Sequence, residues 1–300
     1  MPGQGRRGLN LPVIIGGLYM AVETICYAQQ LRNKVSSLRR QGKTIGIVPT
    51  MGALHAGHAS LLTRARQDCD VLVVSIFVNP IQFNQAADLE NYPRTWEADM
   101  ALCQQIGVDI VYAPEAQDMY PPGFQSKVCL NSITQPMEGA GRPGHFDGVA
   151  TVVSKLFNAS MADFAWFGEK DFQQLKMVTQ MVKDMDMGVQ IVAVPTVREK
   201  DGLALSSRNR RLNAAQRQDA LSLSRALQTM ITAARQGQHQ VEDLLVLGRQ
   251  ELAKSVVLEY LEVVDATTLE RLVRLHGNSR ALIAAQVGPV RLIDNMDISI

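Results

Sequence analysis

Two histidines three residues apart, His55 and His58, lie in a glycine-framed stretch that reads IGIVPTMGALHAGHASLL over residues 45–62. Gly52 and Gly57 have the spacing of the glycines in a P-loop, G-x-x-x-x-G-K-[ST], but His58 takes the place of the lysine. An imidazole can donate a hydrogen bond to a phosphate oxygen and balance charge as pyrophosphate departs. The stretch therefore predicts phosphate chemistry that uses histidines instead of the lysine.

The position of this stretch between two predicted elements supports the same interpretation. The preceding residues, TIGIVPT at 44–50, are typical of a buried strand, and a helix is expected from His58 onward. In an open parallel sheet, ligands bind beyond the carboxyl ends of the strands, where the first N–H groups of a helix can bind phosphate. Histidines at i and i+3 near a helix start also point the same way. The alternative, a pair of incidental surface histidines, leaves the glycines and the strand unexplained.

Seven stretches of the chain together resemble one enzyme family. An H-x-G-H motif after a first strand resembles the nucleotidyltransferase superfamily, whose members transfer AMP. The wider set resembles the pantothenate synthetase (pantoate–β-alanine ligase) family over residues 20–300, and it reads VPTMGALHAGH, SIFVNPIQF, YPRT, RPGHFDGV, FGEKDFQQL, DGLALSSRN and RLIDN. The resemblance implies that ATP, a substrate used with Mg²⁺, and (R)-pantoate form pantoyl adenylate and pyrophosphate. The β-alanine amine then attacks the adenylate to give pantothenate and AMP. A homodimer is the implied assembly.

The resemblance also implies an ATP site made from three loops. Its residues are Pro49, Thr50, Met51, Gly52, His55, Gly57, His58, Gly168, Glu169, Lys170, Asp171, Val197, Leu205, Ser206, Ser207 and Arg208. Within it, the implied catalytic set is His55, His58, Lys170 and Arg208. His58 would be the acid that assists pyrophosphate departure, while Lys170 would contact the phosphates and Asp171 the ribose. Val197 would receive the adenine through its backbone.

The implied acid-binding residues are Asn79, Gln82 and Gln174, which would contact pantoate, with Gln82 also contacting β-alanine. Asp99, which follows YPRT on a predicted helix, is the candidate metal ligand, although Mg²⁺ often rests mainly on ATP phosphates. Trp166, just before FGEKD, is bulkier than the resemblance leads us to expect, and we expect it to reshape the packing behind that loop.

Several of these residues also have simpler interpretations. An acidic residue such as Asp171 suits a solvated helix start through the helix dipole, whereas Lys170 is harder to explain in that way. A polar amide such as Gln82 is often a turn residue, and an isolated arginine such as Arg208 is usually solvated. A single carboxylate such as Asp99 is weak evidence for a metal.

Other functions fit the sequence less well. A nucleotidyltransferase that stops at the adenylated product needs no amine site, so FVNPIQF and EKDFQQL would go unexplained. A nucleotide-sensing module without catalysis is disfavoured because His58, Lys170 and Arg208 are all present. A hydride-transferring Rossmann enzyme is excluded because no G-x-G-x-x-G follows the first strand.

Composition agrees with a cytoplasmic enzyme that has small-molecule partners. The 300 residues are 46% hydrophobic with a net charge of +1 and no run of five like charges, which disfavours a nucleic-acid partner. No apolar run reaches the 18 residues that a membrane-spanning helix needs. The four cysteines are scattered, which favours free thiols. Residues 1–19 imitate a secretory signal, but proline and glycines interrupt the apolar part, so a disordered extension or an artefact is expected there.

Alternating strand and helix patterns predict a Rossmann-like parallel sheet domain flanked by helices over residues 20–198. Helices are expected at 23–41, 58–69, 95–106, 150–160 and 171–185, and strands at 44–50, 71–78, 109–114, 164–168 and 189–197. A smaller α+β domain is expected over 199–300. It comprises a helix capped by Asn213, a helix at 240–254, and strands at 257–264, 281–287 and 290–293.

Overall fold

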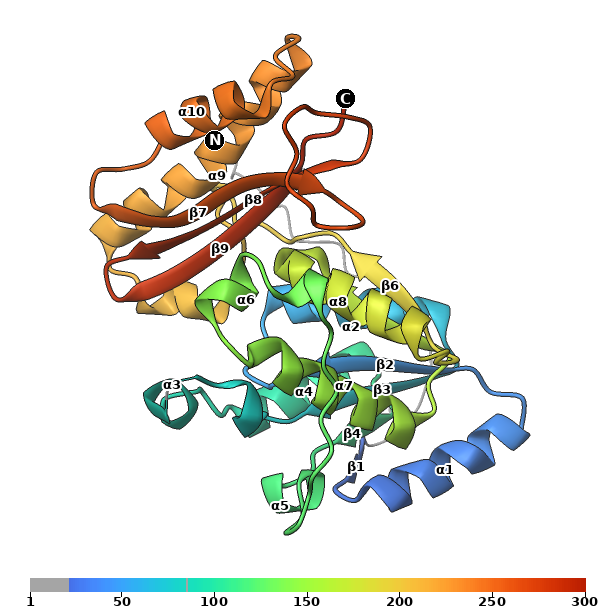
Figure 1. Cartoon of the computed structure of the whole chain (residues 1–300). Helices are drawn as coiled ribbons and strands as arrows, with labels where there is room; N and C mark the ends of the chain where they lie inside the picture. Colours follow the sequence, from blue (N-terminus) through green and yellow to red (C-terminus); the bar gives the residue numbers. More distant parts are fainter. Residues whose placement is uncertain (1–21, 85) are drawn as a thin grey trace, which may run out of the picture.

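The structure, a computed structural model, describes residues 22–84 and 86–300 (Figure 1). The expectation for residues 1–19 lies outside these described residues. The described chain forms a larger unit around a parallel sheet and a smaller unit around an antiparallel sheet. This arrangement confirms the predicted fold class.

The larger sheet has six strands in the order β1-β4-β3-β2-β5-β6, and all of its pairings are parallel. The strands are β1 (Glu23–Ile25), β2 (Ile45–Thr50), β3 (Val71–Ile76), β4 (Ile110–Tyr112), β5 (Phe164–Gly168) and β6 (Gln190–Val194). The chain proceeds from β2 through β3 to β4 and then returns to place β5 on the other side of β2. The strand order therefore reverses between β2 and β5, which is where an open α/β sheet binds its ligands.

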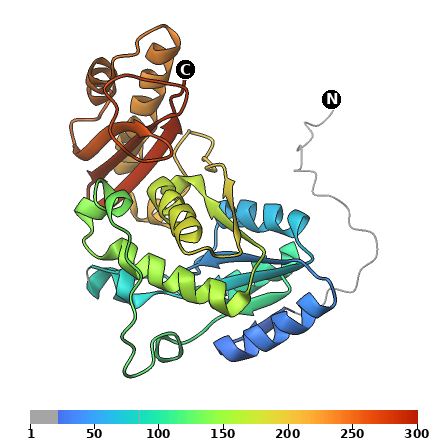
Figure 2. The ribbon, with the colours of Figure 1, turned by 45° about the vertical axis from the view of Figure 1, so that its right-hand side comes forward.

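Helices cover both faces of this sheet (Figures 1 and 2). One face carries α1 (Ala28–Arg40), α7 (His145–Ser160) and α8 (Phe172–Asp184), and the other carries α2 (Ala56–Asp68) and α4 (Trp96–Ile106). Ile47 of β2 lies in the hydrophobic cluster of the first face and Val48 in that of the second, and both are fully buried. Burial on both faces explains why β2 is almost continuously apolar in sequence.

The shorter segments are η1 (Pro80–Gln82), α3 (Ala86–Glu90), α5 (Ala116–Met119), η2 (Ser132–Thr134), α6 (Glu138–Gly141), η3 (Glu169–Asp171) and η4 (Ser207–Arg211).

The smaller unit packs two helices on a three-stranded antiparallel sheet in the order β7-β8-β9. Its elements are α9 (Ala214–Arg235), α10 (Val241–Gln250), β7 (Val256–Asp265), β8 (Ser279–Val287) and β9 (Val290–Asp297). Asn213 caps α9 as predicted, because its side chain accepts from the Gln216 N–H while the Gln216 side chain accepts from the Asn213 N–H. In neither unit is a described helix both long and apolar enough to cross a membrane.

The predicted helix at 23–41 is wrong in its first turn. Residues 23–25 form strand β1, which pairs with β4 at the edge of the sheet, and the helix begins at Ala28. Ile25 lies three residues before Ala28, a helical spacing, but it is buried beside β4 instead. A nonlocal strand partner overrides the local pattern here.

Trp166 of β5 is completely buried, and the backbone of β2 makes room for it. A Cβ atom added at Gly46 of β2 would lie 2.5 Å from Cζ3 of Trp166 and 2.7 Å from Sγ of Cys69. Gly46 and Trp166 lie on the neighbouring paired strands β2 and β5. The large indole therefore fits because Gly46, which its ring approaches on β2, has no side chain.

We expect Gly46→Ala to lower the free energy of unfolding by about 1–3 kcal/mol, because the new methyl group overpacks this site. Trp166→Phe should relieve the clash, so the double variant should lose less stability than the sum of the two single changes. Denaturant unfolding measures all three. Gly188→Ala is the control, because an added Cβ there meets no atom within 4 Å. Additive losses would contradict direct packing between the two positions.

Candidate active site

Two connected cavities lie at the carboxyl ends of β2 and β5. The inner cavity has a volume of about 250 Å³, and the outer one, of about 1200 Å³, extends towards the smaller unit. Both are lined by Phe83, Arg142, Lys170, Asp171, Ser206 and Arg208. Most of the site residues implied by the sequence resemblance line the inner cavity. The exceptions are Gly52, Asp99 and Glu169.

The two histidines cap the start of α2 and thereby fix their own tautomers. Nδ1 of His55 accepts a hydrogen bond from the Gly57 N–H at 3.1 Å, and Nδ1 of His58 accepts from the His55 N–H at 3.3 Å. Each Nδ1 is therefore unprotonated, and a neutral ring carries its proton on Nε2. The ring centroids are 4.2 Å apart. Nε2–H of each ring therefore remains as a donor for a ligand in the cavity that both residues line.

Both imidazoles are neutral near pH 7. Burial first, and then the neighbouring His55 and Lys170 against the opposing effect of Asp171, lower the pKa of His58 to about 3. Burial also lowers the pKa of His55, with added contributions from Lys170 and Arg210. This modifies the expected role of His58 as an acid, because without bound phosphate the ring is a neutral hydrogen-bond donor. A triphosphate would raise the pKa of both rings by its negative charge.

Asp99 holds the loop that leads into the histidines. Its carboxylate accepts hydrogen bonds from the N–H groups of Ala53 (2.9 Å) and Leu54 (2.8 Å), and from the hydroxyl of Thr95 (3.0 Å). Ala53 has a φ of 50°, in the left-handed region, so this loop needs such anchoring. Gly52, with a φ of 79°, also passes close to Asp99, because an added Cβ would lie 3.1 Å from Oδ2.

Asp99 is 2% exposed, and these hydrogen bonds satisfy its buried carboxylate. Among residues 22–84 and 86–300, no group of three or more His, Cys, Asp or Glu side chains could hold a metal. The structure therefore gives no support to Asp99 as the metal ligand.

A chain of buried amides forms another wall of the inner cavity. The Asn79 amide donates to Oε1 of Gln82 (2.9 Å) and to the carbonyl oxygen of Gly148 (3.1 Å), and its Oδ1 accepts from the Tyr120 hydroxyl (2.8 Å). Asn79 is 1% exposed, and its amide holds the side-chain oxygen of Gln82. Nε2 of Gln82 contacts the weak acceptor Sδ of Met51, at 3.1 Å, and can donate to a better acceptor.

Arg142 and His145 belong to the site although sequence reasoning gave them no role. Nδ1 of His145 lies 2.9 Å from the Gln82 carbonyl oxygen, and its Nε2 lies 3.0 Å from Nη1 of Arg142. The ring therefore donates to Gln82 and accepts from Arg142 as a neutral imidazole. Burial, followed by the charge of Arg142, lowers the pKa of His145 to about 4. Both residues lie in RPGHFDGV, which was the available signal.

The remaining implied residues come from the end of β5, from α8 and from the loops after β5 and β6. Lys170 in η3 lies 3.3 Å from Oδ1 of Asp171. Desolvation would raise the pKa of Asp171, but Lys170, Arg208 and Arg142 outweigh it and hold that pKa below its usual value. Oγ of Ser206 accepts from the Arg208 N–H at 3.2 Å and so begins η4. Among the described residues that line the inner cavity, Asp171 is the one carboxylate beside several cationic and neutral donors, which suits a polyanionic ligand.

Curated relatives of the chain carry one name. "Pantothenate synthetase" of Cereibacter sphaeroides is 52% identical over 270 residues, which are 90% of this chain and 97% of that protein. The protein of the same name from Trichlorobacter lovleyi is 49% identical over 269 residues, covering 89% and 95%.

Solved structures of the same kind share the fold. Pantothenate synthetase from Thermus thermophilus is 43% identical with a TM-score of 0.88, covering 93% of this chain and 100% of that one. Pantoate–β-alanine ligase from Francisella tularensis, solved with β,γ-ATP and β-alanine, is 34% identical with a TM-score of 0.77, covering 92% and 97%. The family model of pantoate–β-alanine ligase matches residues 23–297. The chain therefore belongs to the pantoate–β-alanine ligase family.

Proposed function

We propose that this chain uses ATP to condense (R)-pantoate with β-alanine, giving pantothenate, AMP and pyrophosphate through pantoyl adenylate. The observation that carries the proposal is a single cavity in which phosphate-binding groups face amide groups. His55, His58, Lys170 and Arg208 supply the first kind, and Gln82 supplies the second. The Francisella relative, whose solved complex contains an ATP compound and β-alanine, supports the same pair of substrates.

In the first step, a pantoate carboxylate oxygen attacks the α-phosphorus of ATP, and the bond to the bridging oxygen breaks to release pyrophosphate. Negative charge grows on the leaving group, and Lys170 and Arg208 lie where they can balance it. The Nε2–H groups of His55 and His58 add hydrogen bonds without permanent charge. Such preorganised donors favour the transition state over the ground state.

In the second step, the β-alanine amine attacks the acyl carbon, and AMP leaves with the electron pair of the acyl–oxygen bond. The enzyme mainly has to hold the two reactants together. Gln82 and Gln174 line the cavity where the acids would bind, whereas Asn79 acts by orienting Gln82. For ATP we propose that Val197 receives the adenine and Asp171 contacts the ribose.

Mg²⁺ enters this proposal as part of the ATP substrate. Asp171 is the one carboxylate among the described residues that line the inner cavity, and it already contacts Lys170. This donor set does not fit a dedicated protein site for Mg²⁺, which prefers several oxygen ligands. The phosphate oxygens would hold the ion and share its charge.

We further propose that the enzyme works in the cytoplasm as a homodimer, as the family resemblance implies. Light scattering should then give a molar mass near twice the 33.0 kDa of the chain.

An assay of the purified protein with Mg-ATP, (R)-pantoate and β-alanine tests the function. Pantothenate, AMP and pyrophosphate should form in equal amounts. Without β-alanine, pyrophosphate should appear only in the first turnover, because pantoyl adenylate stays bound. A nucleotidyltransferase that stops at the adenylate would instead release pyrophosphate continuously and would not respond to β-alanine.

His58→Ala should slow adenylation by about 10²- to 10³-fold while ATP binding changes little, since the lost hydrogen bond forms fully only as pyrophosphate leaves. His58→Gln retains an N–H donor near the position of Nε2 and should keep at least about tenfold more activity than His58→Ala. Single-turnover release of pyrophosphate measures both. If the glutamine variant is as inactive as the alanine variant, the ring must transfer a proton and is not merely a donor.

Asp99→Asn should lower the free energy of unfolding by about 1–3 kcal/mol, because the new NH₂ group meets a backbone N–H that has lost its acceptor. The loss should be the same with Mg²⁺ and with a chelator. Denaturant unfolding in both solutions measures it. Asp184→Asn, at an exposed carboxylate that accepts from Gln180, is the matched control. A loss seen only with Mg²⁺ would restore Asp99 as a metal ligand.

A further inference from the structure

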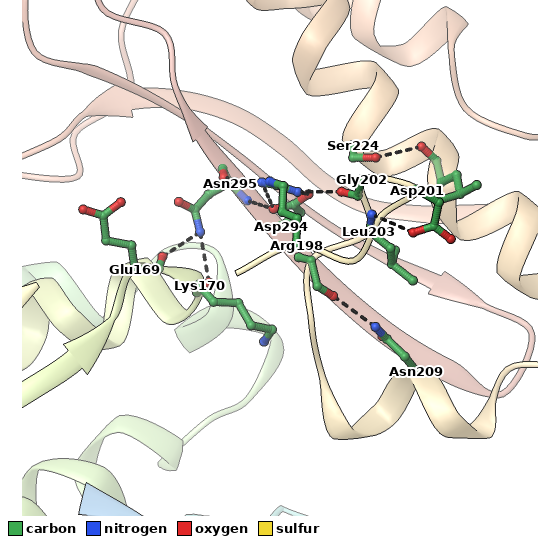
Figure 3. Close-up of polar contacts among 12 residues, drawn as sticks. Glu169, Lys170, Arg198, Asp201, Gly202, Leu203, Asn209, Ser224, Asp294 and Asn295 are labelled. Carbon is green, nitrogen blue, oxygen red and sulfur yellow. Dashed lines mark hydrogen bonds and ion pairs between the residues drawn. The ribbon is translucent and has the colours of Figure 1, made fainter. Parts of the chain in front are cut away.

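The end of strand β9, in the smaller sheet, contacts the loop that carries Lys170, which follows β5 of the larger sheet (Figure 3). Nδ2 of Asn295 donates to the carbonyl oxygens of both Glu169 and Lys170, each at 2.9 Å. Asn295 is 3% exposed, so these bonds are shielded from water. Asn295 ends the stretch RLIDN, which the proposed reaction steps leave without a role.

Hydrogen bonds from Arg280 to its side-chain oxygen fix the orientation of the Asn295 amide. Nε and Nη2 of Arg280, on the paired strand β8, donate to Oδ1 of Asn295 at 2.8 and 2.6 Å. Nη2 of Arg280 also contacts Oε2 of Glu169 at 3.0 Å, and its guanidinium lies 4.4 Å from the ring centroid of Phe172. Because two donors occupy Oδ1, the NH₂ group must face the loop.

The contact matters because η3, the segment of Lys170, is a single short turn. A three-residue 3₁₀ helix has little stability of its own, so its position depends on what surrounds it. It follows β5 of the larger sheet, and Asn295 binds two of its three carbonyl oxygens from the smaller sheet. The backbone from which the Lys170 side chain extends is therefore positioned by both units.

Asp294, the residue before Asn295, makes a similar contact with the turn that precedes Ser206 and Arg208. Asp294 binds Arg198 through two hydrogen bonds of 2.7 and 2.8 Å, and Nη1 of Arg198 donates to the Gly202 carbonyl oxygen at 3.1 Å (Figure 3). This turn leads directly into Ser206 and Arg208. Two consecutive residues of β9 thus contact both loops whose cations face the cavity.

We propose that Asn295 is a positioning residue for adenylation, which holds the Lys170 backbone so that the lysine amino group meets the triphosphate. The inference rests on the phosphate-binding role of Lys170 in the proposed function. The smaller sheet then contributes to catalysis without touching the substrate. A displacement of about 1 Å at a catalytic group can lower a rate about 100-fold, so two hydrogen bonds to this turn are enough to matter.

Asn295→Asp tests the proposal, because it keeps the shape and the oxygen that Arg280 contacts but replaces the NH₂ donor with an oxygen. We expect kcat/KM for ATP in adenylation to fall about 10- to 100-fold, with KM for β-alanine unchanged. In a Lys170→Ala background, the same change should alter the rate by less than about twofold, because it acts through Lys170.

Tyr260→Phe is the matched control for contact between the two units. It removes a hydrogen bond of 2.8 Å from the smaller sheet to Oε1 of Glu138 and leaves the Lys170 loop untouched. This variant should lose thermal stability but keep its kcat/KM for ATP. An equal loss of activity in Tyr260→Phe would overturn the proposal, since any weakened contact between the units would then have the same effect.

The remaining outcomes separate this inference from the proposed function. If Lys170→Ala is strongly impaired and Asn295→Asp is not, or if their effects multiply in the double variant, Asn295 does not position Lys170. If Lys170→Ala is fully active, the phosphate role of Lys170 is wrong, and any loss in Asn295→Asp then also contradicts the inference.

Should Asn295→Asp fail to fold, Arg280→Lys tests the same point, because a lysine cannot make both bonds to Oδ1. We expect kcat/KM for ATP to fall in Arg280→Lys by less than in Asn295→Asp. An unchanged kcat/KM for ATP would overturn the proposal.

Discussion

The parallel pairing of β2 with β5 is the constraint on which the site depends. Gly46 and Ile47 of β2 pair with Phe164 and Ala165 of β5, so both strands end at the same edge of the sheet. The loop with the histidines leaves β2 there, and the loop with Lys170 leaves β5. About 115 residues separate these loops in the chain, so only the reversal of strand order between β2 and β5 brings them together. The close packing of Trp166 of β5 against Gly46 of β2 also stabilises this strand pair.

The site combines permanent charge with fixed neutral donors. Lys170 and Arg208 carry the positive charge, whereas the histidines are kept neutral by burial and by neighbouring cations. A neutral imidazole whose Nδ1 is held by a backbone N–H presents its Nε2–H without reorientation. The same capping interactions stabilise the start of α2, so the residues that we propose bind phosphate also form the local fold. Gln82 is held in a comparable way, because Asn79 donates to its side-chain oxygen and His145 donates to its backbone carbonyl oxygen. The Tyr120 hydroxyl in turn donates to Oδ1 of Asn79.

The smaller unit is more than a cover for the larger one. Tyr260 and Arg291 bind Glu138, while Arg280 and Asn295 bind the segment of Lys170. These contacts cross from an antiparallel sheet to the functional edge of a parallel one. The outer cavity between the two units therefore has walls from both, including Arg142 and Arg291.

The sequence by itself determined the elements whose signals are local. The β5 strand at 164–168 and the Asn213 cap were predicted where the structure has them, because apolar runs and capping pairs involve neighbouring residues. The glycine-framed histidines and the family motifs likewise indicated loops that line one cavity in the structure.

Only the tertiary structure decided features that depend on distant partners. β1 is a strand because β4 lies beside it, and Asp99 anchors a loop about 45 residues away. The neutral state of His58 follows from burial, and Asn295 reaches Lys170 from a different sheet. Hydrogen-bond partners and desolvation arise when remote segments pack together, and neither is encoded in the spacing of residues along the chain.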